Sequence, residues 1–287
     1  METKLKVKLL TNTKEPELII ATAGKLCYSP SNIEDLMEKQ TSESVEKFVK
    51  MLVSMGHESP LEHCSFSFAI EGVSRSLTHQ LVRHRIASYS QQSQRYVREG
   101  QFEYVVPKDI KHNPYLTNLY VRQMLRSQKL YDTIVDGLIS DYIYDSERYG
   151  EFLNIQIKKL KIDIDEFHKF ADEYWLTEGF LEELRTRYKR LYSTLEKKAI
   201  ENARYIFPNA IETKIIVTMN LRTLINFCHH RCCNRAQEEI NELAWEMVRE
   251  IEKVSPLLAQ CLGATCQFGK CTEGSMCCMK PYEKKCV

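Results

Sequence analysis

Apolar residues recur along the chain with two different periods, and each period predicts a different kind of element. In KLKVKLLTN every second residue from Leu5 to Leu9 is aliphatic, with lysines between them, which is typical of a strand with one buried face. The phenylalanines and the isoleucine of SFSFAI alternate in the same way, and this predicts a strand at 64 to 73. We expect a third strand at 94 to 106, a segment that includes FEYVVP.

Other segments carry the helical period. Residues 42 to 55 place apolar side chains at i, i+3, i+4 and i+7, which predicts an amphipathic helix ended by Gly56. Residues 75 to 85 also have a helical pattern. From about 113 to 203 the chain is charged and almost entirely compatible with helix, with leucines and tyrosines spaced to pack between helices.

Two further helices are predicted near the C-terminal end. Asn220 is a good N-cap for a short helix at 220 to 231. Asn234, with Gln237 three residues later, resembles a capping box for the next helix. That helix carries a regular apolar stripe made of Ile240, Leu243, Ala244, Met247, Val248 and Ile251.

These elements predict an α+β fold, in which a mostly antiparallel sheet is flanked by helices and an enlarged helical region occupies the middle of the chain. We expect a single catalytic domain at 1–256, with a helical insertion at about 110–200. After Pro256 the periodicity is lost, and 257–287 is predicted to be a Cys-rich tail.

Composition and charge exclude some classes of protein. The 287-residue chain has 40 basic and 39 acidic side chains and a net charge of +1, so it lacks the basic excess of a general nucleic-acid coat. No apolar run approaches the roughly 20 residues of a membrane span. The N-terminal segment is broken by charges and lacks the apolar core of a signal peptide. We expect a cytoplasmic protein whose partners include neither nucleic acid nor membrane.

The segment RHRIASYSQQSQRY, at 83 to 96, concentrates cations and hydrogen-bonding groups. Gln80 stands three and four residues before Arg83 and His84, which places the three on one helix face. The planar guanidinium suits phosphate, and serine and glutamine suit a polar heterocycle. The segment indicates a site for a flat, phosphorylated ligand, although a capped surface loop with arginines by chance has the same composition.

A second polar group of residues lies far along the chain, in ARYIFPNAIETKIIVTMNLRTLINFCHHRCCNRAQEE. Arg222 and Asn226 share a helix face at i, i+4. Asn226 stands between apolar residues, where a buried amide requires partners. This group is either a second wall of the same site or a helix cap with surface arginines.

The residues of both groups resemble the flavin-dependent thymidylate synthases. RHRIASYSQQSQRY is similar to the family signature, and GHESPLEH, HQLVRHR, ARYIFP and MNLRTLINFCHHR match the family in the same order. The matching blocks cover roughly 56 to 107 and 200 to 250. The resemblance implies FAD as cofactor, NADPH and methylenetetrahydrofolate as co-substrates, dUMP as substrate, and a homotetramer with active sites shared between subunits.

The resemblance also implies roles for individual residues. The implied flavin contacts are Ser59, Arg83, His84, Arg85, Gln91, Asn220, Arg222 and Asn226. Ser59 falls, with His57 and Glu62, in the block that a neighbouring subunit lends to the flavin site. The implied dUMP contacts are Gln80, Arg83, Gln91, Gln92, Ser93, Gln94, Arg95, Arg204 and Arg231. Arg231 matches the arginine that activates the uracil ring, and no enzyme nucleophile is expected.

The sequence departs from the family at one position of the signature. Many members have Asn-Glu where this chain has Ser90-Gln91, so an amide replaces an acid. Gln91 can hydrogen-bond but cannot transfer a proton as a carboxylate does. The chain also has 10 glycines and no GxGxxG, so we expect no Rossmann phosphate loop for the flavin.

The cysteines leave alternatives open. Nine of the 11 lie after residue 227, in CHHRCC and in the tail. We expect CHHRCC to supply residues behind the uracil site and no metal, because it lacks paired CxxC motifs. A structural metal in the tail remains open, as does a metal- or redox-sensing protein. A nucleic-acid-binding module that uses Arg75, Arg83, Arg85 and Arg95 is a further alternative, which the neutral net charge disfavours.

Overall fold

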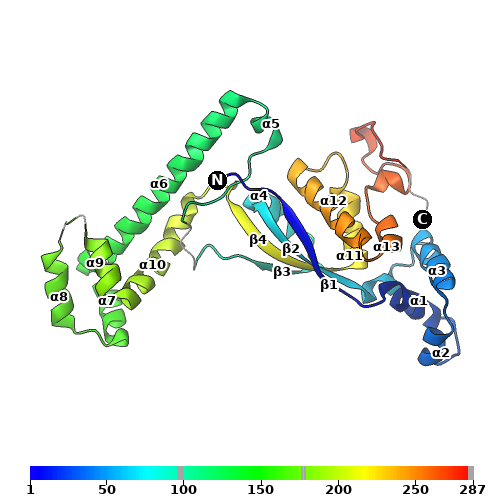
Figure 1. Ribbon diagram of the computed structural model, residues 1–287, viewed down its shortest axis with the longest axis horizontal. Coiled ribbons are helices and arrows are strands. Elements are labelled where there is room, and N and C mark those ends of the chain that lie inside the picture. The colour runs from blue at the N-terminus through cyan, green and yellow to red at the C-terminus, as the bar shows by residue number, and fades with distance from the viewer. Residues whose placement is uncertain (96–99, 176, 178, 284–287) are drawn as a thin grey trace. The chain divides into compact units, whose positions relative to one another are not determined.

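The computed structural model describes residues 1–95, 100–175, 177 and 179–283, which form two compact units (Figure 1). We call residues Glu2–Gln92 and Glu212–Val287 the sheet unit, and Met1 with Ser93–Ile211 the helical unit. None of the helices in the described ranges combines the length and the apolar character that a bilayer crossing requires.

The sheet unit is built on a sheet that has four strands within the described residues, in the order β1-β2-β4-β3, with every neighbouring pair antiparallel. Its strands are β1 (Lys6–Asn12), β2 (Ser65–Ser74), β3 (Ser88–Gln91) and β4 (Glu212–Asn220). Its helices are α1 (Pro16–Leu26), α2 (Ile33–Glu38), α3 (Ser42–Ser54), α4 (Arg75–Leu81), α11 (Leu221–Arg231), α12 (Glu238–Glu252) and α13 (Pro256–Gln260). The α+β prediction with an antiparallel sheet is confirmed.

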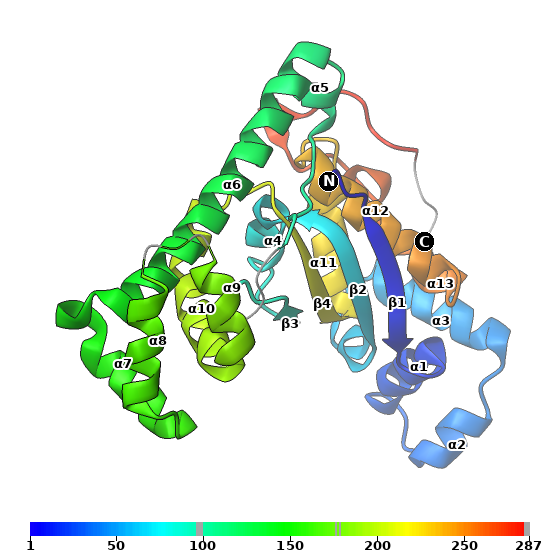
Figure 2. The same cartoon turned by 60° about the vertical axis from the view of Figure 1, so that its left-hand side comes forward.

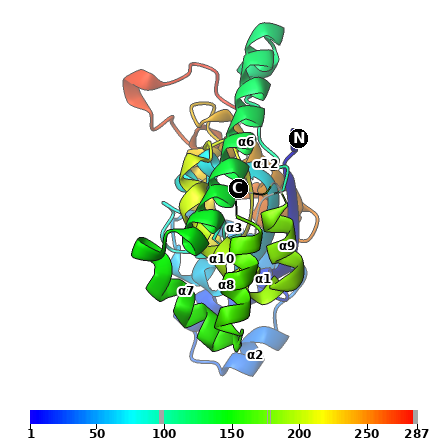
Figure 3. The same ribbon diagram turned by 90° about the vertical axis from the view of Figure 1, so that its left-hand side faces the viewer.

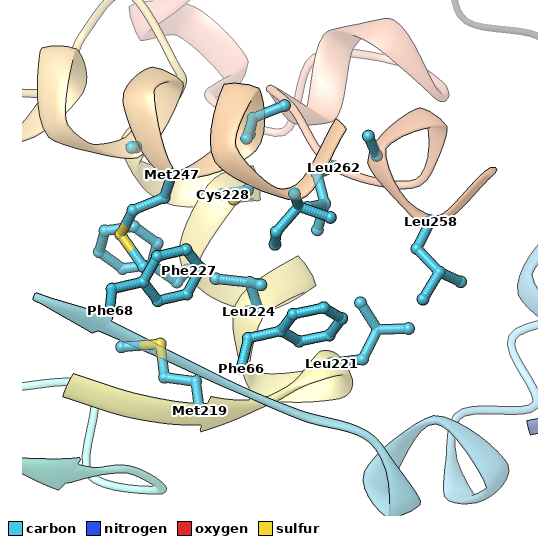
Figure 4. Close-up of a cluster of buried hydrophobic side chains, with 14 of the residues drawn as sticks. Phe66, Phe68, Met219, Leu221, Leu224, Phe227, Cys228, Met247, Leu258 and Leu262 are labelled. Atoms are coloured by element: carbon cyan, nitrogen blue, oxygen red, sulfur yellow. The ribbon is translucent and has the colours of Figure 1, made fainter. Parts of the chain in front are cut away.

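One face of the sheet carries the main core. Phe66 and Phe68 of β2 are fully buried and face Leu224 and Phe227 of α11, and Met247 of α12 completes the layer (Figure 4). The apolar stripe predicted for the helix after Gln237 is buried throughout. Helices α4, α11 and α12 cover this face of the sheet, as Figure 2 shows for α4 and α11. The apolar residues of the predicted strand and of the predicted helices are therefore buried in one common core.

Gly72 explains a break in the pairing of β2. The register of β2 with β4 shifts between Ile70 and Val73. Gly72 adopts a positive φ of 73°, and a Cβ at this position would lie 1.9 Å from the carbonyl oxygen of Lys4. Only glycine fits both the left-handed backbone and this close approach.

The helical unit consists of helices that pack along one another. They are α5 (Lys108–Lys111), α6 (Pro114–Tyr144), α7 (Ser146–Leu160), α8 (Ile164–Glu173), α9 (Phe180–Arg187) and α10 (Lys189–Ala203). Helix α6 packs against α7 and α10, and Figure 3 shows α7 to α10 gathered beside its C-terminal half. The tyrosine-rich stripes form their core, with Tyr131 and Tyr142 buried. The helical prediction for this region is confirmed.

Several boundaries differ from the predictions. The helix expected at 75 to 85 ends at Leu81. The strand expected at 94 to 106 is wrong for the described residues, where Tyr104 forms only an isolated bridge with Ile211; residues 96–99 of it lie outside the described residues. The sheet is completed instead by β3 and β4, neither of which the pattern analysis predicted.

The N-cap of α12 is also not the residue expected. Gln237 itself caps the helix, because its side-chain oxygen accepts from the backbone N–H of Ile240. Asn234 binds the C-terminal segment, donating to the carbonyl of Lys280 at 3.1 Å. The capping box at Asn234 was therefore wrong, while the N-cap at Asn220 is confirmed by its acceptance from Thr223.

The packing of the core predicts that two methionines contribute differently to the stability of the protein. Met247→Ala should lower the free energy of unfolding of the protein by about 2 to 5 kcal/mol, because it leaves a cavity between α12 and β2. Met51→Ala, in α3, removes the same side chain from a position that is 41% exposed and should cost less than about 1 kcal/mol. Denaturant unfolding followed by circular dichroism measures both. Equal losses would contradict this account of the core.

Candidate active site

The candidate site is built where two helices of the sheet unit end. Helix α4 starts directly after β2 and is capped by Ser74, whose hydroxyl accepts from Leu77 N–H at 3.0 Å. Helix α11 starts directly after β4 in the same way, with Asn220 as its cap. Because caps fix where each helix begins, they also fix where the polar residues at each helix end are presented.

Arg231, at the end of α11, contacts Gln80 in the last turn of α4 and His84, three residues after that helix ends. Its Nε donates to His84 Nε2 at 3.2 Å, and its NH1 group donates to Gln80 Oε1 at 3.3 Å. His84 can accept only through an unprotonated ring nitrogen, so the contact requires the neutral imidazole. The side chains that the sequence placed 147 residues apart thus meet directly.

Burial and charge keep His84 neutral. Burial, followed by the positive charges of Arg231 and His230, lowers the pKa of His84 to about 4. Burial and the neighbouring Arg83 also lower the pKa of Arg231, but a guanidinium remains charged at neutral pH. The pair therefore presents one fixed positive charge beside an uncharged ring.

Neighbouring side chains hold this pair in position. The ring of Phe227 lies edge-on to His84, with 5.0 Å between ring centroids. The hydroxyl of Tyr89 in β3 lies 2.8 Å from the carbonyl oxygen of His84 and 2.9 Å from that of Leu81. Asn241 of α12 donates to the carbonyl oxygen of Arg231 at 2.9 Å. Contacts from β3, α11 and α12 thus orient the groups at the ends of both helices.

A pocket of about 620 Å³ opens beside this contact. It is lined by Glu58, Arg83, His84, Arg85, Ile86, Arg222, Thr223, Ile225, Asn226 and His229. A second hollow of about 320 Å³ contains Arg231 and shares His84 and Asn226 with the first. The sheet unit therefore brings together five of the predicted flavin contacts beside the predicted uracil-activating arginine.

Arg222 is held by two carboxylates at the pocket. Its guanidinium lies 2.7 Å from Glu58 and 2.5 Å from Glu62. These ion pairs are about half exposed, so they contribute little to stability. Their effect is geometric, because they fix the guanidinium at the pocket wall. Ser59 is exposed at the start of the short 3-10 helix Ser59–His63 and does not line the pocket.

Other predicted contacts have structural partners within the sheet unit. The Gln91 amide donates to Thr78 at 3.0 Å and to Thr213 at 3.3 Å. Gln92 donates its backbone N–H to Lys214, and Asn220 caps α11. Asn226 is exposed at the pocket, so the expectation of a buried amide was wrong.

The remaining predicted dUMP contacts belong to the helical unit. Arg95 pairs with the Glu201 carboxylate at 2.5 Å, and Arg204 Nε donates to the Glu201 carbonyl at 3.2 Å. Ser93 accepts from the backbone N–H of Arg95. Gln94 Nε2 is buried and has no hydrogen-bond partner among the described residues. Within this unit, Arg95 and Arg204 are therefore both held by Glu201.

The sequence analysis did not name all the residues of the pocket. It missed Ile225 and His229, which stand three and seven residues after Arg222, with Asn226 at four. That spacing places all four on one face of α11. The helical period was therefore a signal that could have found them, whereas Glu58 and Ile86 carry no such signal.

The fold of the chain is similar to that of a known protein. That protein is a solved UMP/dUMP methylase, PolB from Streptomyces cacaoi, with a TM-score of 0.63, 16% identity, and coverage of 91% of this chain and 95% of the other. At this identity the likeness concerns the fold alone. The chain therefore shares the fold of this methylase, and its sheet unit carries an arginine-lined pocket.

The sequence comparisons identify the family. The family model described as Thymidylate synthase complementing protein matches residues 8–257. Flavin-dependent thymidylate synthases from Clostridium tetani and Geobacter sulfurreducens are 47% and 37% identical, over 98% of this chain in each case and 96% and 97% of theirs. The chain belongs to the flavin-dependent thymidylate synthases, a family of enzymes, and the resemblance seen in the sequence is confirmed.

The Arg231–His84 contact predicts how His84 titrates. We expect histidine NMR signals to give a His84 pKa near 4, and Arg231→Gln to raise it while burial keeps it below 6.5. Arg222→Gln, the same change on the same helix, should leave it unmoved. The folded-state pKa lies below the unfolded value, so His84 should lower the free energy of unfolding as the pH falls from about 6.5 toward 4. If Arg231→Gln left the pKa of His84 unchanged, the contact between the two side chains would be contradicted.

Proposed function

We propose that the chain converts dUMP into dTMP, with methylenetetrahydrofolate as the carbon donor, FAD as the cofactor and NADPH as its reductant. The observation that carries this proposal is the fixed cation of Arg231 beside the neutral His84, at the edge of an arginine-lined pocket. Support also comes from relatives named flavin-dependent thymidylate synthase that match almost the whole chain.

The chemistry of the pocket suits a flavin dinucleotide. Its volume of about 620 Å³ lies within the usual range for small-molecule sites. Arg83, Arg85 and Arg222 supply planar donors for phosphate oxygens, and Asn226 supplies an amide. Ile86 and Ile225 give apolar surface for a ring. When bound, the reduced flavin supplies the hydride that completes the methyl group on uracil C5.

Arg231 has an electrostatic role in this proposal. Uracil C5 becomes reactive when negative charge is favoured on the ring, and a fixed cation favours that charge. Because His84 Nε2 and Gln80 Oε1 each accept from the guanidinium, its plane is set before substrate arrives. A neutral His84 fixes this orientation without adding a second positive charge. No enzyme nucleophile is required, and Ser93 is proposed to position the ligand.

The other substrate contacts remain proposals. Gln80 is supported by its bond to Arg231, and Gln94 by a buried amide nitrogen that lacks a described partner. Arg95 and Arg204 offer guanidinium groups whose orientation Glu201 sets. Gln91 already donates to two threonines, so a ligand contact there would fall to its carbonyl oxygen.

The proposed oligomeric state is the one that the family resemblance implies. We propose a cytoplasmic homotetramer in which a neighbouring subunit lends Ser59 to the flavin site. Ser59 is exposed and lies outside the pocket of its own chain, whereas Glu58 and Glu62 of the same block hold Arg222 within their own chain. Light scattering on the purified protein should give about four times the 33.7 kDa mass of one chain. A monomeric mass for active protein would contradict the shared site.

The proposed role of Arg231 is tested by Arg231→Ala. We expect dTMP formation to fall by about 100- to 1,000-fold, because removal of one preorganised charge from the reacting centre has effects of this size. Flavin absorbance at about 450 nm should persist in the purified variant. The reason is that Arg231 lies in the second hollow and does not line the larger pocket.

Arg249→Ala is the matched control, because Arg249 is an exposed arginine of α12 paired with Glu246. Its turnover should equal that of the unmodified protein. Near-normal dTMP formation by Arg231→Ala would refute the role of this residue. Loss of flavin together with activity would show that Arg231 supports the cofactor and not the uracil.

A further inference from the structure

The C-terminal segment gathers cysteines around a small cavity that the proposed function does not use. The cavity has a volume of about 30 Å³. Five cysteines line it, together with His229 and Tyr282: Cys233, Cys266, Cys271, Cys277 and Cys278. Cys233 follows α11, and the other four come from the segment after α13, so the fold joins parts of the chain that are more than 30 residues apart.

The cysteine sulfur atoms around the cavity differ in their hydrogen-bond partners. Cys271 and Cys277 are close enough for their side chains to hydrogen-bond. The backbone N–H of Met279 donates to Cys277 Sγ at 3.4 Å, which by itself favours the thiolate, but the neighbouring Cys271, burial and Cys278 together raise the pKa of Cys277. Cys278 instead donates its thiol to the carbonyl oxygen of Lys280 at 3.5 Å. This geometry favours Cys277 over its neighbour as a ligand.

Apolar burial anchors the start of this segment but not its cysteine-rich part. Leu262 and Ala264 are buried in the main core, whereas Met276 and Met279 are 62% and 82% exposed. The segment is held on the turn after α11 by polar contacts. Arg235 bonds Glu273 at 3.0 Å and the carbonyl of Met276 at 3.1 Å, and Tyr282 donates to Asn234 at 2.5 Å. Such exposed contacts are individually weak.

We propose that Cys233, Cys266, Cys271 and Cys277 bind one zinc-class metal ion, which holds the C-terminal segment on the turn after α11. Thiolates are the preferred ligands of Zn²⁺, and four of them complete its tetrahedral coordination. A cavity of about 30 Å³ suits a single ion better than an iron–sulfur cluster. Each coordinating thiol releases its proton, so binding frees four protons and leaves a site of net charge −2.

Binding draws the ligands together. Among the described residues, no three His, Cys, Asp or Glu side chains already stand in a metal-ligating arrangement. Metal binding and local folding are commonly coupled, so the four thiols need close only when the ion enters. Cys233 lies two residues after Arg231, and Asn241 donates to the carbonyl oxygens of both. The ion would therefore also fix the end of α11.

The test is the zinc content of the full-length protein. After purification under reducing conditions with Zn²⁺ and removal of excess metal, elemental analysis should find about one zinc per chain. Cys271→Ser and Cys277→Ser should each lower this content at least tenfold and lower the midpoint of thermal unfolding. Cys278→Ser, a change of the neighbouring cysteine in the same cavity, and Cys27→Ser, in an exposed position at the end of α1, should retain the zinc.

A second measurement does not depend on how the variants fold. Co²⁺ added to the metal-free, unmodified protein should give the ligand-field bands of tetrahedral thiolate coordination, at wavelengths longer than the flavin absorbs. Zinc content that is absent, or unchanged in Cys271→Ser and Cys277→Ser, would overturn the proposal. Iron with inorganic sulfide, or thiols that react only after a reductant is added, would overturn it in favour of a cluster or a disulfide. None of these readouts requires thymidylate synthesis.

Discussion

The antiparallel pairing of β2 with β4 determines where the candidate site can form. Ser65 at the start of β2 pairs with Asn220 at the end of β4, and Ser74 pairs with Glu212. The helix that follows each strand therefore begins at opposite ends of the strand pair. Both helices bury apolar residues in the same core, so they run toward each other over one face of the sheet. Their C-terminal ends then meet, which brings Arg231 to His84.

This arrangement also explains why cations can gather there. The C-terminal end of a helix carries a partial negative charge, which favours arginine and histidine in and after the last turn. Arg83 and Arg85 follow α4, and Arg231 ends α11. Repulsion between neighbouring charges is limited further because His84 stays neutral and because Arg222 is paired with two carboxylates. The site can therefore hold several guanidinium groups before any anionic ligand binds.

The sequence predicted the elements that have a strong apolar period. Helix α12 and strand β2 follow their patterns closely, because one face of each is buried in the main core. Strand β4 was missed because the apolar Ile216 stands between Ile215 and Val217 and obscures their alternation, although Ile216 itself is 44% exposed. Strand β3 has no such alternation. It is a four-residue polar segment whose pairing with β4 is decided by tertiary contacts, including the Gln91 amide on Thr213.

The site was harder to predict than the fold. The local spacing of Gln80, Arg83 and His84 could be derived, but their contact with Arg231 depends on strand pairing between distant segments. Only the family resemblance joined the two groups before the structure did. Conversely, that resemblance assigned Asn220 and Gln91 to ligands without showing that each already bonds within the fold. A residue can carry both roles only through an atom that the fold leaves available.

The turn between α11 and α12 connects the site with the C-terminal segment. On one side, Arg231 extends from the last turn of α11 toward His84. On the other, Asn234 and Arg235 bond Lys280 and Glu273. Asn241 binds the backbone of the turn at two carbonyl oxygens, so the two sides cannot move independently without loss of these bonds. The density of cysteines at the end of the sequence thus corresponds to one location in the fold, adjacent to the residue on which the proposed chemistry depends.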